Sequence, residues 1–295
     1  MTLEEVRQFY AEEIRIAAPL RSHAVGEAFA RVPRENFLGP GPWQFGNASF
    51  TSGPGYFPAD DTDPRHVYHN VTVALDMSRT LCNGQPSAIG YLIDNLDIQP
   101  GERVFHLGCA TGYFTAIMAE VTGPSGQVVA CEVDADLAAR AQKNLAGYPN
   151  VTVHTVSGTE FDPGPCDAML INAGVTVPLT GWLDRLAEGG RMAVALTIPM
   201  GPPTVGKGMV AKVTRRAGAF AANILTYVAI YSCEGGRNPE LEPELGKAMG
   251  TGALMKLASI RREPHAADET CIVHGTGICL SSAAIPEAAA EQAGR

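Results

Sequence analysis

The sequence predicts an α/β protein built around a doubly wound, mostly parallel β-sheet. The first observation is the stretch Arg103–Glu132, which has the order strand, glycine turn, helix, loop, strand and acidic residue. The second is that strand-like and helix-like segments keep alternating as far as Leu196, which is typical of βαβ units. The third is a pair of β-like runs beyond Pro203, which predicts an antiparallel hairpin at the sheet edge.

The central stretch predicts a ligand-binding turn between two buried strands. Arg103–Leu107 and Val128–Cys131 are short apolar runs, and Tyr113–Val121 has helical composition. In open α/β sheets the ligand lies beyond the carboxyl ends of the strands, and an acidic residue about twenty positions after the turn receives ribose hydroxyls. We therefore expect a nucleotide-like ligand with Glu132 on its ribose.

The glycine spacing selects the kind of nucleotide. A dinucleotide fingerprint G-x-G-x-x-G would need glycine at positions 108, 110 and 113, where the chain has Gly108, Ala110 and Tyr113. The G-x-A-x-G spacing that ends at Gly112 resembles motif I of class I S-adenosylmethionine (SAM) methyltransferases. The resemblance implies SAM as cofactor and S-adenosylhomocysteine as product. An NAD-dependent dehydrogenase and a plain packing turn remain as alternatives.

The N-terminal part is expected to combine helices with a lid. Residues 38–66 are rich in Gly, Pro, Ser and Asp but carry several aromatic residues, which favours a packed functional segment. Its aromatic residues are Trp43, Phe45, Phe50, Tyr56 and Phe57. The other elements expected here are a helix over 2–23 ended by Pro19, a helix over His23–Arg31, a strand over 67–75 and a helix over Gln85–Leu96.

The remaining elements follow from the same periodicities. Before the hairpin we expect a helix at Ala135–Leu145, strands at Val151–Thr155 and Ala168–Ile171, a helix at Leu179–Leu186, a turn at Gly189-Gly190 and a strand at Arg191–Leu196. From the hairpin onwards we expect strands at Gly208–Arg215 and Ala221–Tyr231, a helix near Leu245–Leu257, a strand at Thr270–Leu280 and a fraying tail after Ser282. The predicted domains are N-terminal helices and lid (1–75), a cofactor-binding core (76–232) and a C-terminal extension (233–295).

Composition narrows the class of protein. The formal net charge of −9 argues against nucleic acid as the main partner, although Lys207, Lys212, Arg215 and Arg216 form a small basic cluster. No apolar run is long enough to span a membrane, and the acidic N-terminus is unlike a signal peptide. Seven cysteines without C-x-x-C favour free thiols in a reducing cytoplasm. No metal motif is recognised, so we expect no metal.

Several motifs in order resemble the protein-L-isoaspartate O-methyltransferase family. AFARVPRENFL is similar to the family's AF..VPR..F motif, and Val67-Tyr68 lies where the family has Ala-Tyr. Thr80 and Gln85-Pro86 are similar to the ends of its T-I-S-Q-P loop. PCDAMLINAG followed by WLDRLAEGGRMAVAL resembles its sequence after motif I. The resemblance covers about His23 to Leu196 and implies a Rossmann-like class I methyltransferase fold.

The chain departs from this family at three places. The loop Thr80–Pro86 is two residues longer and contains Asn83-Gly84, which favours a turn with positive φ. His106 stands where the family has an acidic residue, and we expect it to be a buried core histidine. Val156-Ser157-Gly158 replaces the family's Gly-Asp-Gly, whose carboxylate addresses the adenine amine. Ser157 can do so only through its hydroxyl or its backbone.

The resemblance implies two groups of site residues. Thr80 and Gln85 are expected to donate hydrogen bonds to a carboxylate, with His69 and Tyr68 close to the acceptor, Arg79 pairing an acidic substrate and Cys82 not acting as a nucleophile. The expected cofactor-binding residues are Gly108, Cys109, Ala110, Thr111, Gly112, Tyr113, Glu132, Val133, Ser157, Gly158 and Asn172.

These residues favour a SAM-dependent O-methyltransferase acting on a carboxylate. Because the substrate loop and the C-terminal part depart from the family, the leading hypothesis is a biosynthetic tailoring enzyme for a small molecule or peptide. The alternatives are the protein-L-isoaspartate repair enzyme, an N- or C-methyltransferase of a small molecule, and an inactive SAM-binding regulatory module. Methylation of nucleic-acid bases is disfavoured because Asn172-Ala-Gly-Val replaces the [DN]-P-P-[YF] motif. The oligomeric state cannot be predicted.

Overall fold

The computed structural model describes residues 1–46, 55–200 and 205–285. The chain divides into two compact units, which are described separately. Unit 1 comprises Met1–Gly101, Cys109–Val128 and Asp134–Thr155, and unit 2 comprises Glu102–Gly108, Val129–Val133 and Val156–Arg295. The division into 1–75, 76–232 and 233–295 stays a prediction. Phe50 of the predicted lid and residues 286–295 of the tail lie outside the described residues.

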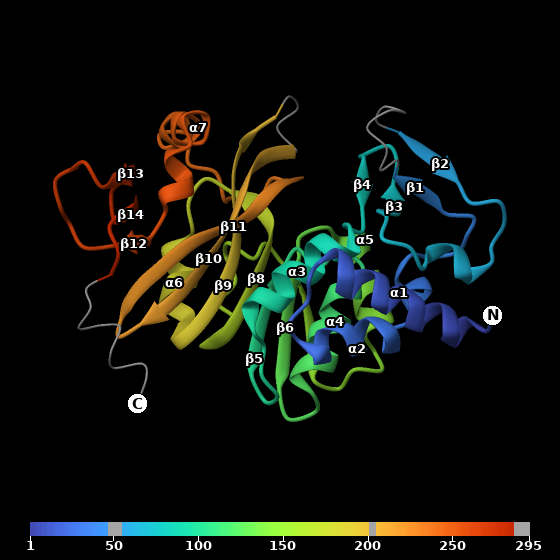
Figure 1. Cartoon of the computed structure of the whole chain (residues 1–295). Helices are drawn as coiled ribbons and strands as arrows, with labels where there is room; N and C mark the ends of the chain where they lie inside the picture. The colour runs from blue at the N-terminus through green and yellow to red at the C-terminus, as the bar shows by residue number, and fades with distance from the viewer. Residues whose placement is uncertain (47–54, 201–204, 286–295) are drawn as a thin grey trace. The chain divides into compact units, whose positions relative to one another are not determined.

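Unit 1 begins with two helices that pack side by side, α1 (Leu3–Ala17) and α2 (His23–Arg31) (Figure 1). A capping box starts α1, because Thr2 Oγ1 accepts from the backbone N–H of Glu5 at 3.2 Å while the Glu5 carboxylate accepts from the N–H of Thr2 at 2.8 Å. Both predicted helices are confirmed.

The rest of unit 1 consists of short strands, turns and three further helices. The predicted lid contains a small antiparallel hairpin in which the rings of Phe45 and Phe57 lie 5.6 Å apart. The elements are η1 (Arg34–Phe37), β1 (Gln44–Gly46), β2 (Tyr56–Pro58), η2 (Pro64–Val67), β3 (Ala74–Asp76), β4 (Leu81–Cys82), α3 (Pro86–Leu96), α4 (Tyr113–Thr122), α5 (Ala135–Asn144) and β7 (Val151–Thr155).

The strand predicted over 67–75 is wrong. Residues 68–72 form an irregular segment, and only Ala74–Asp76 is strand, paired with Leu81–Cys82. The β-branched residues of this stretch gave the strand signal, but its carbonyl groups bond to a buried arginine side chain instead of a neighbouring strand.

Unit 2 is organised by a large sheet whose order is β13-β14-β12-β11-β10-β9-β8-β5-β6. Strands β5 (Arg103–Leu107), β8 (Cys166–Val175) and β9 (Leu186–Pro199) are parallel neighbours. Strands β6 (Gln127–Glu132) and β8 lie on opposite sides of β5, so the strand order reverses beside β5. This reversal beside β5 is the topological switch point at which open α/β sheets bind ligands.

The antiparallel edge is larger than predicted. The hairpin of β10 (Val205–Arg216) and β11 (Ala219–Tyr231) is confirmed, and three short strands extend it: β12 (Ser259–Arg261), β14 (Ile278–Ser281) and β13 (Cys271–Gly275). The single strand predicted over Thr270–Leu280 is therefore a hairpin, because Gly277 with a φ of +73° turns the chain.

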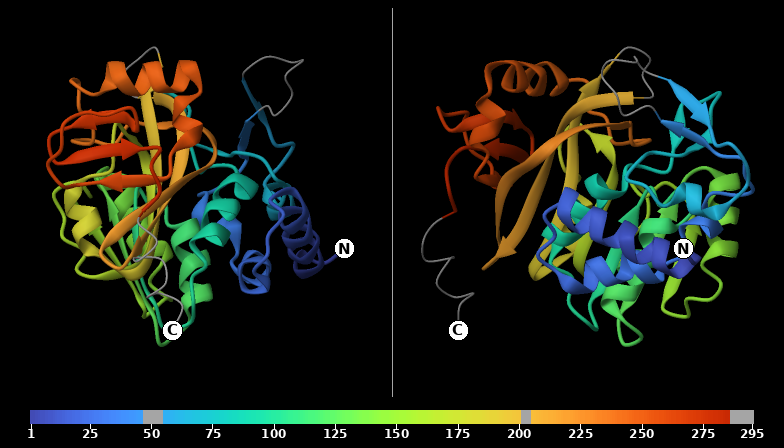
Figure 2. Two further views of the ribbon diagram at one scale, coloured as in Figure 1. Left: turned by 60° about the vertical axis from the view of Figure 1, so that its left-hand side comes forward. Right: turned by 45° about the vertical axis from the view of Figure 1, so that its right-hand side comes forward.

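The helices of unit 2 are α6 (Thr180–Arg185), α7 (Glu242–Thr251) and the 3-10 helix η3 (Ala253–Lys256). Figure 2 shows α7 beside the C-terminal strands, and α7 contacts β13. The helix predicted to reach Leu257 ends earlier, at Gly252, which adopts a φ of +76°. The predicted turn Gly189-Gly190 lies inside β9 as an irregularity of its pairing with β8.

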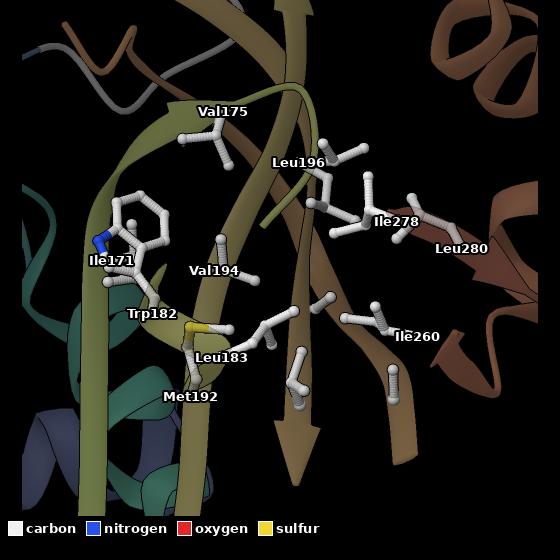
Figure 3. Close-up of a cluster of buried hydrophobic side chains, with 14 of the residues drawn as sticks. Ile171, Val175, Trp182, Leu183, Met192, Val194, Leu196, Ile260, Ile278 and Leu280 are labelled. Carbon is white, nitrogen blue, oxygen red and sulfur yellow. The ribbon is translucent and has the colours of Figure 1, made fainter. Parts of the chain in front are cut away.

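Buried apolar side chains from β8, β9, α6 and the C-terminal strands form one core (Figure 3). Trp182 and Leu183 of α6 cover the face of the parallel strands, and Ile260, Ile278 and Leu280 extend the same cluster under the short strands. The fold class predicted from the sequence is confirmed. Over the described ranges, no helix is both long and apolar enough to cross a membrane.

Candidate cofactor and acceptor site

The carboxyl ends of β5 and β6 lie at Gly108 in unit 2, next to Asn172 of β8. The backbone N–H of Gly108 donates to the carbonyl of Cys131 at 2.9 Å, and Asn172 Nδ2 donates to the carbonyl of Gly108 at 3.4 Å. Gly108 has a φ of +76°, and a Cβ at this position would lie 3.0 Å from the Asn172 carbonyl oxygen. A side chain would therefore strain the backbone and crowd the end of β8.

Glu132 ends β6 and places a carboxylate at the same edge of the sheet. The residue is 7% exposed, while Val133 after it is 48% exposed. Its backbone carbonyl accepts from the N–H of Val156 at 3.1 Å, which fixes the strand end. A largely buried carboxylate beside a switch point has the position and the chemistry to accept hydrogen bonds from two ribose hydroxyls.

Ser157 and Gly158 form a tightly packed turn in unit 2. A Cβ on Gly158 would lie 2.4 Å from Leu107 Cδ1, and Trp182 Nε1 donates to the Gly158 carbonyl at 3.0 Å. The Ser157 hydroxyl lies 2.8 Å from Thr159 Oγ1, and Thr159 Oγ1 donates to the Glu234 carbonyl at 3.1 Å. We name Gly108, Glu132, Ser157, Gly158 and Asn172 the strand-end cluster.

The second part of the glycine turn lies in unit 1. Ala110 has a φ of +47° and Gly112 a φ of +94°, and a Cβ on Gly112 would lie 2.7 Å from Leu145 Cδ1. The Thr111 carbonyl accepts from Asn144 Nδ2 at 3.0 Å, and Cys109 is buried. Close packing against α5 thus explains the small residues of the turn.

Tyr113 is fully enclosed by other aromatic residues of unit 1. Its hydroxyl lies 3.3 Å from that of Tyr10, and burial raises its pKa well above the usual value. Phe29, Phe37 and Phe114 contact its ring edge to face. The side chain of Tyr113 therefore has a packing role, and only its backbone remains available for the predicted cofactor contact.

Arg34 is a buried cation that the sequence analysis did not single out. Its guanidinium donates to the carbonyls of Val67 at 2.6 Å, His69 at 2.8 Å and Val71 at 2.7 Å, and to Asn83 Oδ1 at 3.3 Å. We name these five residues the Arg34 cluster. In the sequence, Arg34 is marked only by its place in the VPRENF motif. Three of its four hydrogen-bond partners are backbone carbonyls, which every residue carries, so no side-chain pattern points to them.

The Arg34 cluster fixes the loop that was predicted to face the substrate. Asn83 is buried and its Oδ1 also accepts from the N–H of Val73 at 3.1 Å. Gly84 has a φ of +80°, which confirms the expected turn conformation. Thr80 and Gln85, on either side of this turn, are both exposed, and Thr80 has a φ of +57°.

Tyr68 and His69 differ in accessibility. Tyr68 is 2% exposed and its hydroxyl accepts from Arg7 Nε at 2.8 Å and from the N–H of Arg34 at 3.1 Å, and donates to Glu35. This pairing gives Tyr68 a structural role. The side chain of His69 is exposed, so its predicted place near the acceptor stays a prediction.

Arg79 pairs with a carboxylate of the protein, and His106 is enclosed in the core. Arg79 Nη1 lies 2.5 Å from Asp134 Oδ2, while Asp134 Oδ1 caps α5 by accepting from the N–H groups of Asp136 and Leu137. His106 lies inside β5 and is buried, as expected, and burial lowers its pKa to about 3.

Comparison with known proteins identifies the family. The model described as protein-L-isoaspartate(D-aspartate) O-methyltransferase (PCMT) matches residues 56–233. A protein-L-isoaspartate O-methyltransferase of Aeropyrum pernix is 31% identical over 204 residues, which is 68% of this chain and 68% of the relative. The chain belongs to this family.

Other relatives agree with this assignment. A protein-L-isoaspartate O-methyltransferase 1 of Syntrophobacter fumaroxidans is 35% identical over 66% of this chain and 80% of the relative. A solved protein-L-isoaspartate O-methyltransferase shares the fold, with a TM-score of 0.61 at 21% identity over 82% of this chain and 69% of that chain. The family is one of SAM-dependent methyltransferases, as predicted.

The tailoring hypothesis is wrong. It rested on the longer Thr80–Pro86 loop and on the C-terminal extension, but the family match and the most similar relatives favour the repair methyltransferase that had been the alternative. A loop of altered length is compatible with an unchanged reaction, because loops tolerate insertions more easily than the elements that they connect.

The residues of the strand-end cluster fit SAM. A largely buried carboxylate such as that of Glu132 can accept from ribose hydroxyls, and Gly108 leaves bare backbone at the switch point because a Cβ there would crowd Asn172. The hydroxyl of Ser157 can accept a hydrogen bond from an adenine amine. In another solved structure of this fold, from Plasmodium falciparum, S-adenosylhomocysteine is bound (TM-score 0.57, 16% identity, 77% of this chain and 98% of that chain).

Proposed function

We propose that the chain transfers a methyl group from SAM to the carboxylate of L-isoaspartyl residues in proteins or peptides. The observation that carries this proposal is the family match over residues 56–233, supported by relatives that bear this name. We further propose a cytoplasmic location, which is supported by seven cysteines of which none forms a disulfide.

The cofactor-binding residues are assigned by position. We assign Glu132 to the ribose hydroxyls, Gly108 with residues 109–113 and Val133 to the backbone-lined part of the cofactor site, and Ser157-Gly158 to the adenine. Asn172, within β8, is assigned to the side of the site that faces the cofactor. SAM would supply a methyl group bound to a sulfonium, which passes in line to the acceptor oxygen while S-adenosylhomocysteine leaves as the neutral thioether. The role of the chain is then to bind, orient and exclude water.

The acceptor residues are assigned to the loop that the Arg34 cluster fixes. Thr80 and Gln85 carry a hydroxyl and an amide on exposed positions around Asn83-Gly84, and we assign them to the acceptor carboxylate. The positive φ of Thr80 supports this assignment, because a non-glycine residue in this conformation is strained, and such strain is concentrated at functional sites.

The proposed reaction needs no general base. A carboxylate is already ionised at neutral pH, so its oxygen can attack the methyl group without losing a proton. The surroundings of Tyr68 and His106 agree with this. The Tyr68 hydroxyl is occupied by Arg7, Arg34 and Glu35, and His106 is buried inside β5.

The test compares two peptides of the same composition, one with an L-isoaspartyl and one with an L-aspartyl residue. With SAM labelled in its methyl group, we expect label only in the isoaspartyl peptide, and release of all label as methanol on mild base treatment. Binding of SAM without transfer to this peptide would overturn the proposal in favour of a regulatory module. A base-stable methyl group would indicate N- or C-methylation.

A further inference from the structure

We propose that the C-terminal part of the chain holds a structural zinc ion, bound by His265, Cys271, His274 and Cys279. Cys271 and His274 belong to β13, Cys279 belongs to β14, and His265 lies in the segment that leads from β12 to β13. All four lie in unit 2, beyond residue 233 where the family match ends. The site is thus separate from the residues assigned to methyl transfer.

The four side chains already converge on one point. One donor atom from each, sulfur or ring nitrogen, lies within 4.8 Å of each of the other three. Cys271 Sγ is 3.6 Å from His265 Nε2 and 3.7 Å from His274 Nδ1. A tetrahedral zinc with Zn–S of about 2.3 Å and Zn–N of about 2.0–2.1 Å would place a sulfur and a nitrogen ligand about 3.5 Å apart. The observed distances are close to this value.

Neighbouring groups orient these donors toward one another. His265 Nδ1 lies 2.8 Å from the backbone carbonyl of Glu263, so this nitrogen carries the proton and Nε2 presents its lone pair to Cys271. The backbone N–H of Asp268 donates to Cys271 Sγ at 3.4 Å, and such a bond stabilises a thiolate. A fixed histidine tautomer and a supported thiolate are typical of the surroundings of zinc ligands.

The donor set favours zinc. Two thiolates and two imidazoles in a compact arrangement are the Cys₂His₂ set of structural zinc sites, with all four positions supplied by protein. Two thiolates also neutralise the dication, which matters because Cys279 is fully buried. The sequence analysis predicted no metal, because the four residues follow none of the zinc-finger spacings and come together only through the β13–β14 hairpin.

A metal here would join segments that have little regular structure of their own. Strand β12 has three residues, β13 five and β14 four, and the chain between β12 and β13 is held by Arg261, which pairs with Glu263 and Asp268 at 3.0 Å each. Short strands contribute few ladder hydrogen bonds, and a metal that ties the loop to the hairpin stabilises the folded form.

The experiment measures zinc in the full chain purified from zinc-supplemented cells under reducing conditions. We expect about one zinc per chain, and less than about a tenth of that in Cys271→Ser and Cys279→Ser. Cys82→Ser, which changes a half-buried cysteine of unit 1, is the matched control and should keep the full amount. Equal zinc in Cys279→Ser and the wild-type chain would overturn the proposal.

A second measurement avoids variants that fail to fold. The wild-type chain, stripped with a chelator, is titrated with Co²⁺, and we expect the visible absorption of tetrahedral cobalt with thiolate ligands to saturate at about one equivalent. Addition of Zn²⁺ should then abolish this absorption and raise the thermal unfolding midpoint. No cobalt spectrum, or a Cys271–Cys279 disulfide in chain alkylated during lysis, would contradict a zinc site. Neither measurement depends on methyl transfer.

Discussion

The Arg34 cluster and the strand-end cluster use polar groups in opposite ways. In the Arg34 cluster of unit 1, one buried guanidinium donates to three backbone carbonyls and to Asn83. In the strand-end cluster of unit 2, Glu132 and Ser157 lie where parallel strands end at a switch point. The first cluster therefore holds an irregular segment of unit 1 together, whereas the second carries the residues that we propose for the cofactor.

The largest expected effect is on stability, from Arg34→Met. Methionine fills part of the volume but leaves the carbonyls of Val67, His69 and Val71 without their donor. The contacts of Arg34 with the Val67 carbonyl and with Asn83 are buried, so these two acceptors have no ready access to water. Each buried group without a partner costs about 1–3 kcal/mol, so we expect the free energy of unfolding to fall by about 3–5 kcal/mol. Urea unfolding followed by circular dichroism measures this change.

Arg34→Lys is the matched control for this prediction. Lysine keeps the charge, but a single ammonium group cannot reach all four acceptors of the guanidinium. The free energy of unfolding of Arg34→Lys should therefore lie between those of wild type and Arg34→Met. A loss below about 1 kcal/mol in Arg34→Met would show that the loop has other supports and would weaken the contrast between the two clusters.

The next largest effect is on ligand binding, from Glu132→Ala. Removing the carboxylate removes charge-assisted hydrogen bonds to the ribose, and we expect the affinity for SAM to fall by about 2–3 kcal/mol. Calorimetry with SAM and S-adenosylhomocysteine measures this loss. Glu132→Gln keeps the size of the side chain but removes its charge, so it shows how much of the loss is due to the charge. Unchanged affinity in Glu132→Ala would remove this residue from the cofactor site.

We expect His106 to make the protein less stable at acidic pH. This histidine is buried in β5, the strand beside the switch point. Its pKa is lowered to about 3 because burial disfavours the charged ring. Below a pH of about 6.5 the unfolded chain therefore binds a proton that the folded chain does not, and stability falls as the pH falls. The expected contribution is a loss of about 2 kcal/mol between pH 7 and pH 5.

His106→Asn isolates this contribution, because the amide does not titrate. Chemical unfolding at pH 7 and pH 5 should show a smaller loss of stability in the variant, by about 2 kcal/mol. If both proteins lost the same stability between pH 7 and pH 5, other groups would cause the loss and His106 would not have a lowered pKa in the folded chain.

The smallest effect is expected from Ser157→Ala. Its hydroxyl, which we propose for the adenine, is already engaged with Thr159, so its loss should lower SAM affinity by only about 0.5–1.5 kcal/mol. Ser157→Asp, which introduces that carboxylate, should raise the affinity instead. A fall in affinity on Ser157→Asp would show that this turn does not face the adenine.

The sequence by itself predicted the parallel core of the fold and the class of its cofactor. Both depend on local patterns: apolar strands alternating with helices, and small residues at Gly108–Gly112 with an acidic residue at the next strand end. The antiparallel hairpin was predicted for the same reason. The departures at Thr80–Pro86 and in the C-terminal extension favour a tailoring enzyme when they are read without the relatives, and this hypothesis is wrong because such segments vary within a family of unchanged activity.

Only the tertiary structure decided how the irregular segments are held. Residues 68–72 are not a strand, because their carbonyls face Arg34, and no pattern in that stretch records a partner more than thirty positions away. Likewise His265 and Cys279 come together only after Gly277 turns the chain into a hairpin. Periodicity reports which face of an element is buried, whereas contacts between irregular segments depend on where distant backbone atoms lie.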